Sequence, residues 1–122
     1  MKAKNLYAGS LFKLSLRYAY SLDPDAIFVL SAKHGLVDLE QELEPYDLTL
    51  NEMPANEVKG WANAVLDQLR NVADLQEDHF VFLAGERYRK HMLAQMPNHE
   101  VPLRGLSIGK QMRFLKESIQ DE

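Results

Sequence analysis

Apolar residues recur every three or four positions in four parts of the chain, which predicts four helices. The first lies within residues 6–22, where Ser10 is placed to cap its start. The second begins at Pro54, a residue that suits the first turn of a helix. The third covers residues 86–96, and the fourth covers residues 110–119.

Three short apolar runs predict strands. Residues 26–30, "AIFVL", form a continuous run that suits a strand buried on both faces. Residues 79–84, "HFVFLA", form the second run, and residues 100–103 form a third, whose proline places it at an edge. Residues 31–51 are expected to be a long polar loop with one helical turn at residues 39–43.

The order of these elements predicts the fold class. Helices and strands alternate along the chain, as in proteins that wrap helices around a parallel sheet. We therefore expect an α/β fold with three layers, in which helices flank a small, mostly parallel sheet. A chain of 122 residues is expected to form one domain.

Composition narrows the class of protein. Hydrophobic residues make up 46% and charged residues 26%, which is typical of a globular protein and not of a disordered chain. The chain has no cysteine, so disulfides, thiolate metal sites and cysteine nucleophiles are excluded. No apolar run approaches the ~20 residues of a membrane span, and the start lacks a secretory signal. We expect a cytoplasmic protein without a membrane partner.

Charge is unevenly distributed along the chain. The net charge is −4, which argues against a protein that coats DNA by bulk charge. Acids dominate residues 23–57, whereas basic residues dominate residues 87–116. The second segment is compatible with a local basic face, but a solvated helix face is the simpler interpretation.

Unusual polar residues follow each predicted strand. Ligands bind outside the carboxyl ends of strands in open parallel sheets, so we expect these residues to share one pocket with an acidic segment of the first loop. The candidates are Ser31, Lys33, His34 and Gly35; Glu44, Tyr46 and Asp47; Gly85, Arg87 and Tyr88; and Arg104, Gly105, Gly109 and Lys110.

Within this set, His34, Lys33 and Tyr46 are the catalytic candidates. Histidine titrates near neutral pH, so His34 is the candidate acid or base. The other residues are candidates for ligand binding: Arg87 and Lys110 would hold phosphate with Lys33, and Tyr46 or Tyr88 would stack on a ring. A structural reading stays open for each, in which the histidine fixes the loop and the tyrosines belong to the core.

The segment "GLSIGKQ" is similar to a phosphate-binding loop but does not match it. Only three residues separate Gly105 from Gly109, and Gln111 replaces the hydroxyl that would hold magnesium, which excludes an ATPase of this type. A phosphate on the backbone N–H groups of the helix start and a simple tight turn both stay open. The other histidines are scattered, so we expect no metal site and no cofactor.

Three stretches together resemble a bacterial, archaeal and phage family of unknown function: "LSAKHGLVDLEQELEPYDLTL", "FLAGERYRKHM" and "VPLRGLSIGKQMRFL". More distantly the chain is similar to the YaaA family of peroxide stress proteins. The residues that correspond to the skeleton shared with that family are Ser31, Gly35, Pro45, Tyr46, Gly85 and Tyr88. The YaaA resemblance implies DNA binding and limitation of free iron during peroxide stress.

One departure from the resembled family concerns the start of the chain. Family members usually begin with a strand before the first helix, and here Met1 lies just ahead of "AKNLYAGSLFKLSLRYA". A sheet without that strand would keep an unpaired edge, and such edges recruit other chains. We therefore expect a homo-oligomer, or a monomer that is prone to aggregate.

The leading functional hypothesis is recognition of a phosphate-bearing ligand, either a nucleotide or a nucleic-acid segment, with chemistry on a base or a glycosidic bond. The alternative is a non-enzymatic DNA-associated or stress-response binding protein, in which the same loops grip a nucleic-acid backbone. A third reading is a scaffold whose loop residues only lock the fold.

Overall fold

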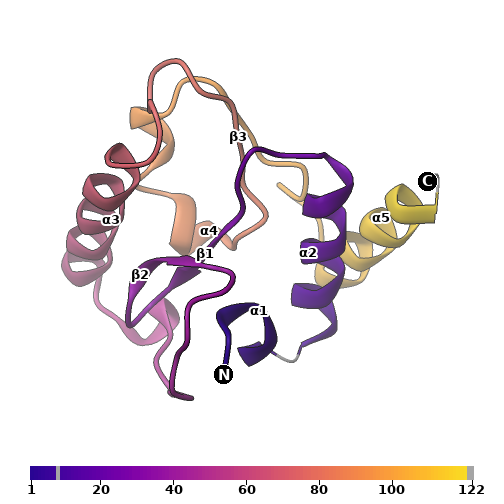
Figure 1. Ribbon diagram of the computed structural model, residues 1–122, viewed down its shortest axis with the longest axis horizontal. Helices are drawn as coiled ribbons and strands as arrows, with labels where there is room; N and C mark the ends of the chain where they lie inside the picture. Colours follow the sequence, from indigo (N-terminus) through magenta and orange to yellow (C-terminus); the bar gives the residue numbers. More distant parts are fainter. Residues whose placement is uncertain (8, 121–122) are drawn as a thin grey trace.

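The structure, a computed structural model, describes residues 1–7 and 9–120 (Figure 1). Its helices are α1 (Ala3–Leu6), α2 (Ser10–Ser21), α3 (Ala55–Arg70), α4 (Glu86–Arg89) and α5 (Ile108–Gln120), with 3₁₀ turns η1 (Leu50–Glu52) and η2 (Leu93–Gln95). Its strands are β1 (Phe28–Ser31), β2 (Gly35–Asp38), β3 (Phe80–Val81) and β4 (His99–Glu100).

The predicted long helices are confirmed as α2, α3 and α5, because each has the regular apolar spacing of a helix packed on one side. Gly9, and not Ser10, occupies the N-cap position of α2. The predicted helix over residues 86–96 is interrupted: α4 is a single turn, and the chain then turns before η2. This path buries Met92 and Met96 in the core, each 1% exposed.

The predicted loop over residues 31–51 contains a strand, so this prediction is wrong in part. β2 pairs with β1 in an antiparallel hairpin, with Phe28 opposite Asp38 and Ser31 opposite Gly35. The helical turn expected at residues 39–43 is also wrong. This segment instead runs beside the first residues of the chain, with a bridge between Lys2 and Glu42.

β3 and β4 form a parallel pair, with Phe80 opposite His99. In the part of the chain that the structure describes, the strands thus form one antiparallel pair and one parallel pair. The α/β class is confirmed as a mixed fold, whereas a three-layer arrangement around one mostly parallel sheet is not confirmed.

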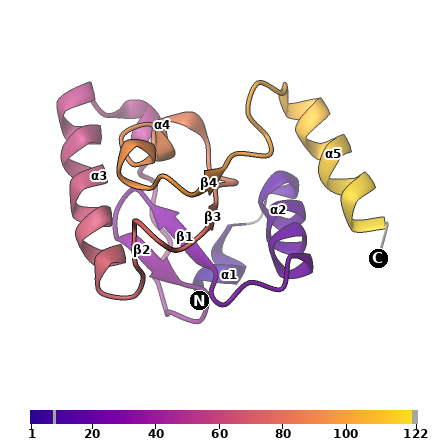
Figure 2. The same ribbon diagram turned by 90° about the horizontal axis from the view of Figure 1, so that it is seen from above.

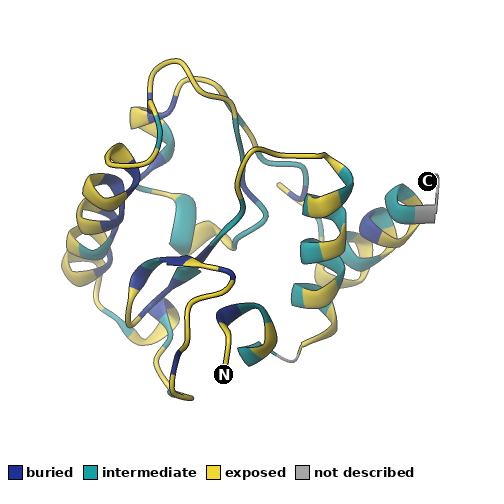
Figure 3. Cartoon of the chain, viewed as in Figure 1, coloured by how far each residue is buried: buried dark blue, intermediate teal, exposed yellow. Residues whose placement is uncertain are grey.

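Two hydrophobic clusters lie on opposite sides of β1. Phe28 and Leu30 pack against the cluster under α3, which contains Val65, Phe82 and Met92 among others. Val29 belongs to the second cluster, with residues of α1, α2 and β2. Alternate residues of a strand point to opposite faces, so β1 contributes to both clusters, and β2 does the same through Leu36 and Val37. Figure 3 shows the matching pattern on α3, which is buried along one side and exposed along the other.

Helices α2 and α5 pack against each other at one side of the molecule (Figure 2). Tyr18 of α2 meets Phe114 of α5 edge to face, with ring centroids 5.8 Å apart. Both helices keep an exposed side that carries basic residues. Among the described residues, no helix combines the length and apolar character required to cross a membrane.

Candidate functional site

Ser31, at the end of β1, is a fully buried polar residue that connects two of the predicted motifs. Its Oγ accepts a hydrogen bond from the backbone N–H of His34 at 3.0 Å. The same oxygen lies 2.7 Å from the hydroxyl of Tyr46. The indole N–H of Trp61 in α3 donates to the carbonyl of Ser31 at 2.8 Å. Ser31 therefore holds the turn of the β1–β2 hairpin and attaches the later loop to it.

The hydroxyl of Tyr46 also forms a hydrogen bond with the hydroxyl of Tyr7, which follows α1. A chain of three hydroxyl groups thus runs from Tyr7 through Tyr46 to Ser31, and such chains strengthen each bond by mutual polarisation. Partial burial and the bond to Tyr46 raise the pKa of Tyr7 well above its ordinary value of 10.0. Tyr7 therefore keeps its proton at neutral pH.

Lys33 and His34 lie on the exposed side of this hydroxyl chain. The Nζ of Lys33 lies 6.0 Å from the centre of the Tyr46 ring, a cation–π distance. The imidazole of His34 meets the same ring edge to face, with centroids 5.6 Å apart and planes at 87°. We call Ser31, Lys33, His34 and Tyr46 the hairpin-tip site.

Chemically, the hairpin-tip site offers a fixed positive charge, an imidazole and an aromatic ring around one point of the surface. The ring nitrogens of His34 have no hydrogen-bond partner in the part of the chain that the structure describes. By contrast, His79 bonds the carboxylate of Glu100 at 2.7 Å, and His99 bonds the carbonyl of Met96 at 2.6 Å. His34 is therefore available to a ligand, and His79 and His99 are not.

Arg87 and Tyr88, from the second predicted loop, make contacts with other residues of the protein. The guanidinium of Arg87 donates to the carbonyl of Leu50 at 3.0 Å and to that of Met53 at 2.7 Å. Tyr88 meets Trp61 edge to face at 5.6 Å and packs in a small cluster with neighbouring apolar residues. Phosphate binding by Arg87 and ring stacking by Tyr88 thus compete with existing contacts, and both stay predictions.

The third predicted loop lies at the start of α5, and no contact described in the structure joins it to the hairpin-tip site. Arg104 and Lys110 are exposed there. Gly105 has φ +78°, a conformation that favours glycine, whereas a Cβ on Gly109 would meet nothing within 4 Å. Only the first of these two glycines is therefore needed for the turn.

The remaining candidates also lie outside the hairpin-tip site. Glu44 and Asp47 are exposed on either side of Tyr46, and Gly85 is an exposed N-cap of α4. Gly35 has φ +75°, and a Cβ there would lie 2.3 Å from Oε1 of Gln68. That oxygen accepts the backbone N–H of Leu36 at 2.9 Å, so Gly35 allows β2 to approach α3 closely. The geometry gives Gly35 a structural role.

Two residues of this region were missed by the sequence analysis. Tyr7 falls within residues 6–22, for which the sequence predicts a helix and no partner for this residue, although a tyrosine that is buried needs a partner for its hydroxyl. Trp61 is one of the regularly spaced apolar residues that predict the helix after Pro54, but its N–H has the same need. That need was the available signal, but the sequence does not show which acceptor meets it.

Comparison with known proteins gives a single result. No significant match was found among curated proteins or among solved structures. The model of a family described as "Family of unknown function (DUF6884)" matches residues 1–117. The expected likeness to a family of unknown function is confirmed, whereas the distant likeness to YaaA stays a prediction. Because the match covers nearly the whole chain, the protein belongs to this family of unknown function.

Proposed function

We propose that the hairpin-tip site binds a phosphate-bearing ligand, either a nucleotide or a segment of nucleic acid. The observation that carries this proposal is the convergence of two separate segments on one exposed patch. Lys33 and His34 come from the hairpin turn, Tyr46 comes from the later loop, and buried Ser31 bonds both. A site held by a buried hydrogen-bonded residue is preorganised, which lowers the cost of ligand ordering.

Each residue has a distinct role in this proposal. Lys33 supplies a charge for a phosphate oxygen, and the imidazole of His34 supplies a hydrogen bond to the same group. The Tyr46 ring offers a face for a base, with a stacking energy of about 1–3 kcal/mol. Ser31 and Tyr7 position the ring and do not touch the ligand. In the enzymatic form of the proposal, His34 is the acid or base for a reaction at a base or a glycosidic bond.

Binding of mononucleotides by calorimetry tests the proposal. We expect the Lys33→Gln and His34→Ala variants each to weaken binding about tenfold, since each loses one charge-assisted contact. The matched controls are Lys90→Gln and His79→Ala, which change exposed residues away from the hairpin-tip site. Equal affinity in all four variants would contradict the proposal. If the His34→Ala variant retained turnover, the binding proposal would stand, but the role of His34 as acid or base would be excluded.

A second candidate function, non-enzymatic binding to a nucleic-acid backbone, is favoured by the charge on the helix pair α2 and α5. The basic residues of this pair are exposed: Lys13, Arg17, Lys110, Arg113 and Lys116. The pair contains one acid, Glu117, which is bonded to Arg113. The rest of the chain carries nine basic residues and seventeen acidic ones. This asymmetry would orient the helix pair toward a polyanion.

Salt dependence separates the two functions. A protein that grips duplex DNA through this helix pair loses affinity with a log–log slope near −0.9 for each phosphate contact. We expect the double variant Lys13→Gln/Arg17→Gln to reduce that slope by about two and to leave mononucleotide binding unchanged. A mononucleotide that binds equally well at low and moderate salt supports the hairpin-tip proposal instead.

A further inference from the structure

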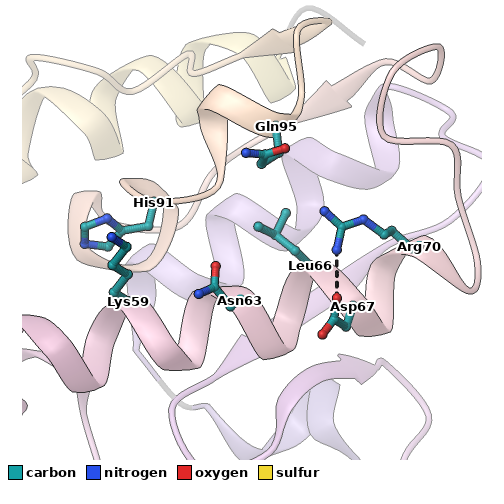
Figure 4. Close-up of a pocket in the computed structure, with 7 residues that line it drawn as sticks. All are labelled: Lys59, Asn63, Leu66, Asp67, Arg70, His91 and Gln95. Atoms are coloured by element: carbon teal, nitrogen blue, oxygen red, sulfur yellow. Dashed lines mark hydrogen bonds and ion pairs between the residues drawn. The ribbon is translucent and has the colours of Figure 1, made fainter.

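A surface groove lies between α3 and the segment that contains η2, outside the hairpin-tip site. Its volume is about 300 Å³. We call it the α3 groove; its lining residues are Lys59, Asn63, Leu66, Asp67, Arg70, His91 and Gln95. Figure 4 shows Lys59 and His91 at one end and Arg70 with Asp67 at the other.

Regular helix geometry arranges the lining residues. Lys59, Asn63, Leu66 and Arg70 are spaced by three or four positions, so they form one stripe along α3. The stripe from Lys59 to Arg70 is about 16 Å long at 1.5 Å per residue. His91 and Gln95 are also four positions apart and form the opposite wall.

The groove is anchored by the core beneath it. Leu66, at its floor, is 3% exposed, and Met92 and Met96, which flank the opposite wall, are 1% exposed each. Since both walls are attached to the same hydrophobic cluster, their spacing is fixed before any ligand binds.

The polar side chains of the Lys59 end are mostly hydrogen-bond donors without protein partners. Among the described residues, Lys59 and His91 have no ion-pair partner, and the side-chain amides of Asn63 and Gln95 have no hydrogen bond. The one carboxylate of the groove, on Asp67, lies 2.7 Å from the guanidinium of Arg70 and is neutralised by it. An ammonium group, an imidazole and the amide of Asn63 therefore lie at the Lys59 end, where no carboxylate of the described residues pairs with them, whereas Gln95 lies above Leu66 and nearer to Arg70 (Figure 4).

We propose that the α3 groove is a second ligand site, which binds a small organic anion through a phosphate or carboxylate group at the Lys59 end. The oxygens of the anionic group accept from Lys59, from the imidazole N–H of His91 and from the amide of Asn63. Leu66 gives the carbon part of the ligand an apolar floor. The volume lies at the small end of ligand pockets, which limits the ligand to a few carbon atoms beyond the anionic group.

NMR titration of the intact chain tests this inference. The probes are inorganic phosphate, glycerol phosphate and succinate, each at constant ionic strength maintained with chloride. We expect amide shifts to concentrate at residues 59–70 and 91–95. The Lys59→Met and His91→Leu variants should each weaken binding about tenfold, because each removes one charge-assisted contact. Lys90→Gln, at an exposed lysine next to His91 that does not line the groove, should bind as the original chain does.

The results of this titration distinguish phosphate from carboxylate as the bound group, and the α3 groove from the hairpin-tip site. Binding of glycerol phosphate but not succinate supports the site and assigns phosphate, and the reverse assigns carboxylate. Shifts that persist unchanged in Lys59→Met and His91→Leu overturn the inference, as does the absence of shifts in the groove with all three probes. The double variant Lys33→Gln/His34→Ala should keep groove binding, so failure of the hairpin-tip proposal is distinguishable from failure of this one.

Discussion

At the scale of the residue, Ser31 shows how a buried polar group is stabilised and used. Burying a hydroxyl without a partner would cost roughly 1–3 kcal/mol. Ser31 Oγ avoids this cost through the N–H of His34 and the hydroxyl of Tyr46. The same two bonds place an imidazole and an aromatic ring on one exposed patch. Stability and the arrangement of the hairpin-tip site therefore depend on one oxygen atom.

Tyr7 leads to a prediction about alkaline pH. Its pKa is raised in the folded chain, so the protein is stabilised below pH 10 relative to the unfolded state and loses that stability as pH rises further. We expect Tyr7→Phe to lower the free energy of unfolding at pH 7 by about 1 kcal/mol, through loss of the bond to Tyr46. The difference between the variant and the original chain should narrow above pH 10.

Urea denaturation from pH 7 to pH 11 measures this effect. Tyr20→Phe is the matched control, because Tyr20 is 54% exposed. A Tyr7→Phe variant that is as stable as the original chain at pH 7 would show that the hydroxyl chain contributes nothing.

At the scale of the element, the β1–β2 hairpin depends on one glycine. Gly35 combines a positive φ with contact to Gln68, so a side chain there is both strained and crowded. We expect Gly35→Ala to lower the free energy of unfolding by about 1–3 kcal/mol. Gly109→Ala, at an open position in α5, should leave stability unchanged or raise it by up to about 1 kcal/mol. Equal effects of the two substitutions in urea denaturation would contradict this account of the turn.

The first residues of the chain run beside the segment that follows β2, and ion pairs connect the two segments. Glu40 bonds Lys2 at 2.7 Å and Lys4 at 2.6 Å, and these two lysines lower the pKa of Glu40 to about 2. A lowered pKa contributes stability above the ordinary value of 4.5, and that contribution is lost as pH falls toward 2.

We expect Glu40→Gln to lower the melting temperature slightly at pH 7 and to have a much smaller effect at pH 2, where about half of the Glu40 carboxyl groups are protonated. The effect should also shrink at high salt, because the pairs are exposed. Glu44→Gln is the control, since Glu44 is exposed and has no ion pair in the described part of the chain. If the melting temperatures of Glu40→Gln and the original chain differed by the same amount at pH 7 and at pH 2, the ion pairs would be ruled out as the cause.

The sequence predicted long elements better than short ones. Apolar spacing identified α2, α3 and α5, each of which is at least twelve residues long, because a sustained pattern of this kind has one helical interpretation. It missed β2, whose four residues begin with a glycine and precede an acidic stretch, because pairing with β1, and not local preference, decides that structure. The sequence predicted that Ser31 and Tyr46 share one pocket, and their hydroxyl groups form a hydrogen bond. It did not predict the hydrogen bond between Tyr7 and Tyr46, because that bond joins segments that are far apart in the chain.

At the scale of the whole molecule, the strand pairs have edges without a strand partner in the described residues. β3 pairs with β4 through the N–H groups of Phe80 and Phe82, and the N–H of Val81 between them has no backbone partner there. Such an edge can bind a strand of another chain. The predicted homo-oligomer is thus compatible with this arrangement and stays a prediction.

Light scattering at high protein concentration tests the oligomer. We expect a dimer for the original chain and a monomer for Val81→Pro, because proline removes the N–H that faces away from β4 and leaves the bonds to β4 in place. A monomer in both cases would contradict association through this edge.

The central claim is that the hairpin-tip site binds a phosphate-bearing ligand, and melting curves with a panel of nucleotides and short oligonucleotides test it most directly. A ligand at 100 times its dissociation constant stabilises the chain by about 2.7 kcal/mol, which raises the melting temperature by about 10 °C in a protein of this size. We predict this rise with at least one nucleotide for the original chain and its loss in Lys33→Gln/His34→Ala. No rise with any member of the panel, or an equal rise in the double variant, would contradict the claim.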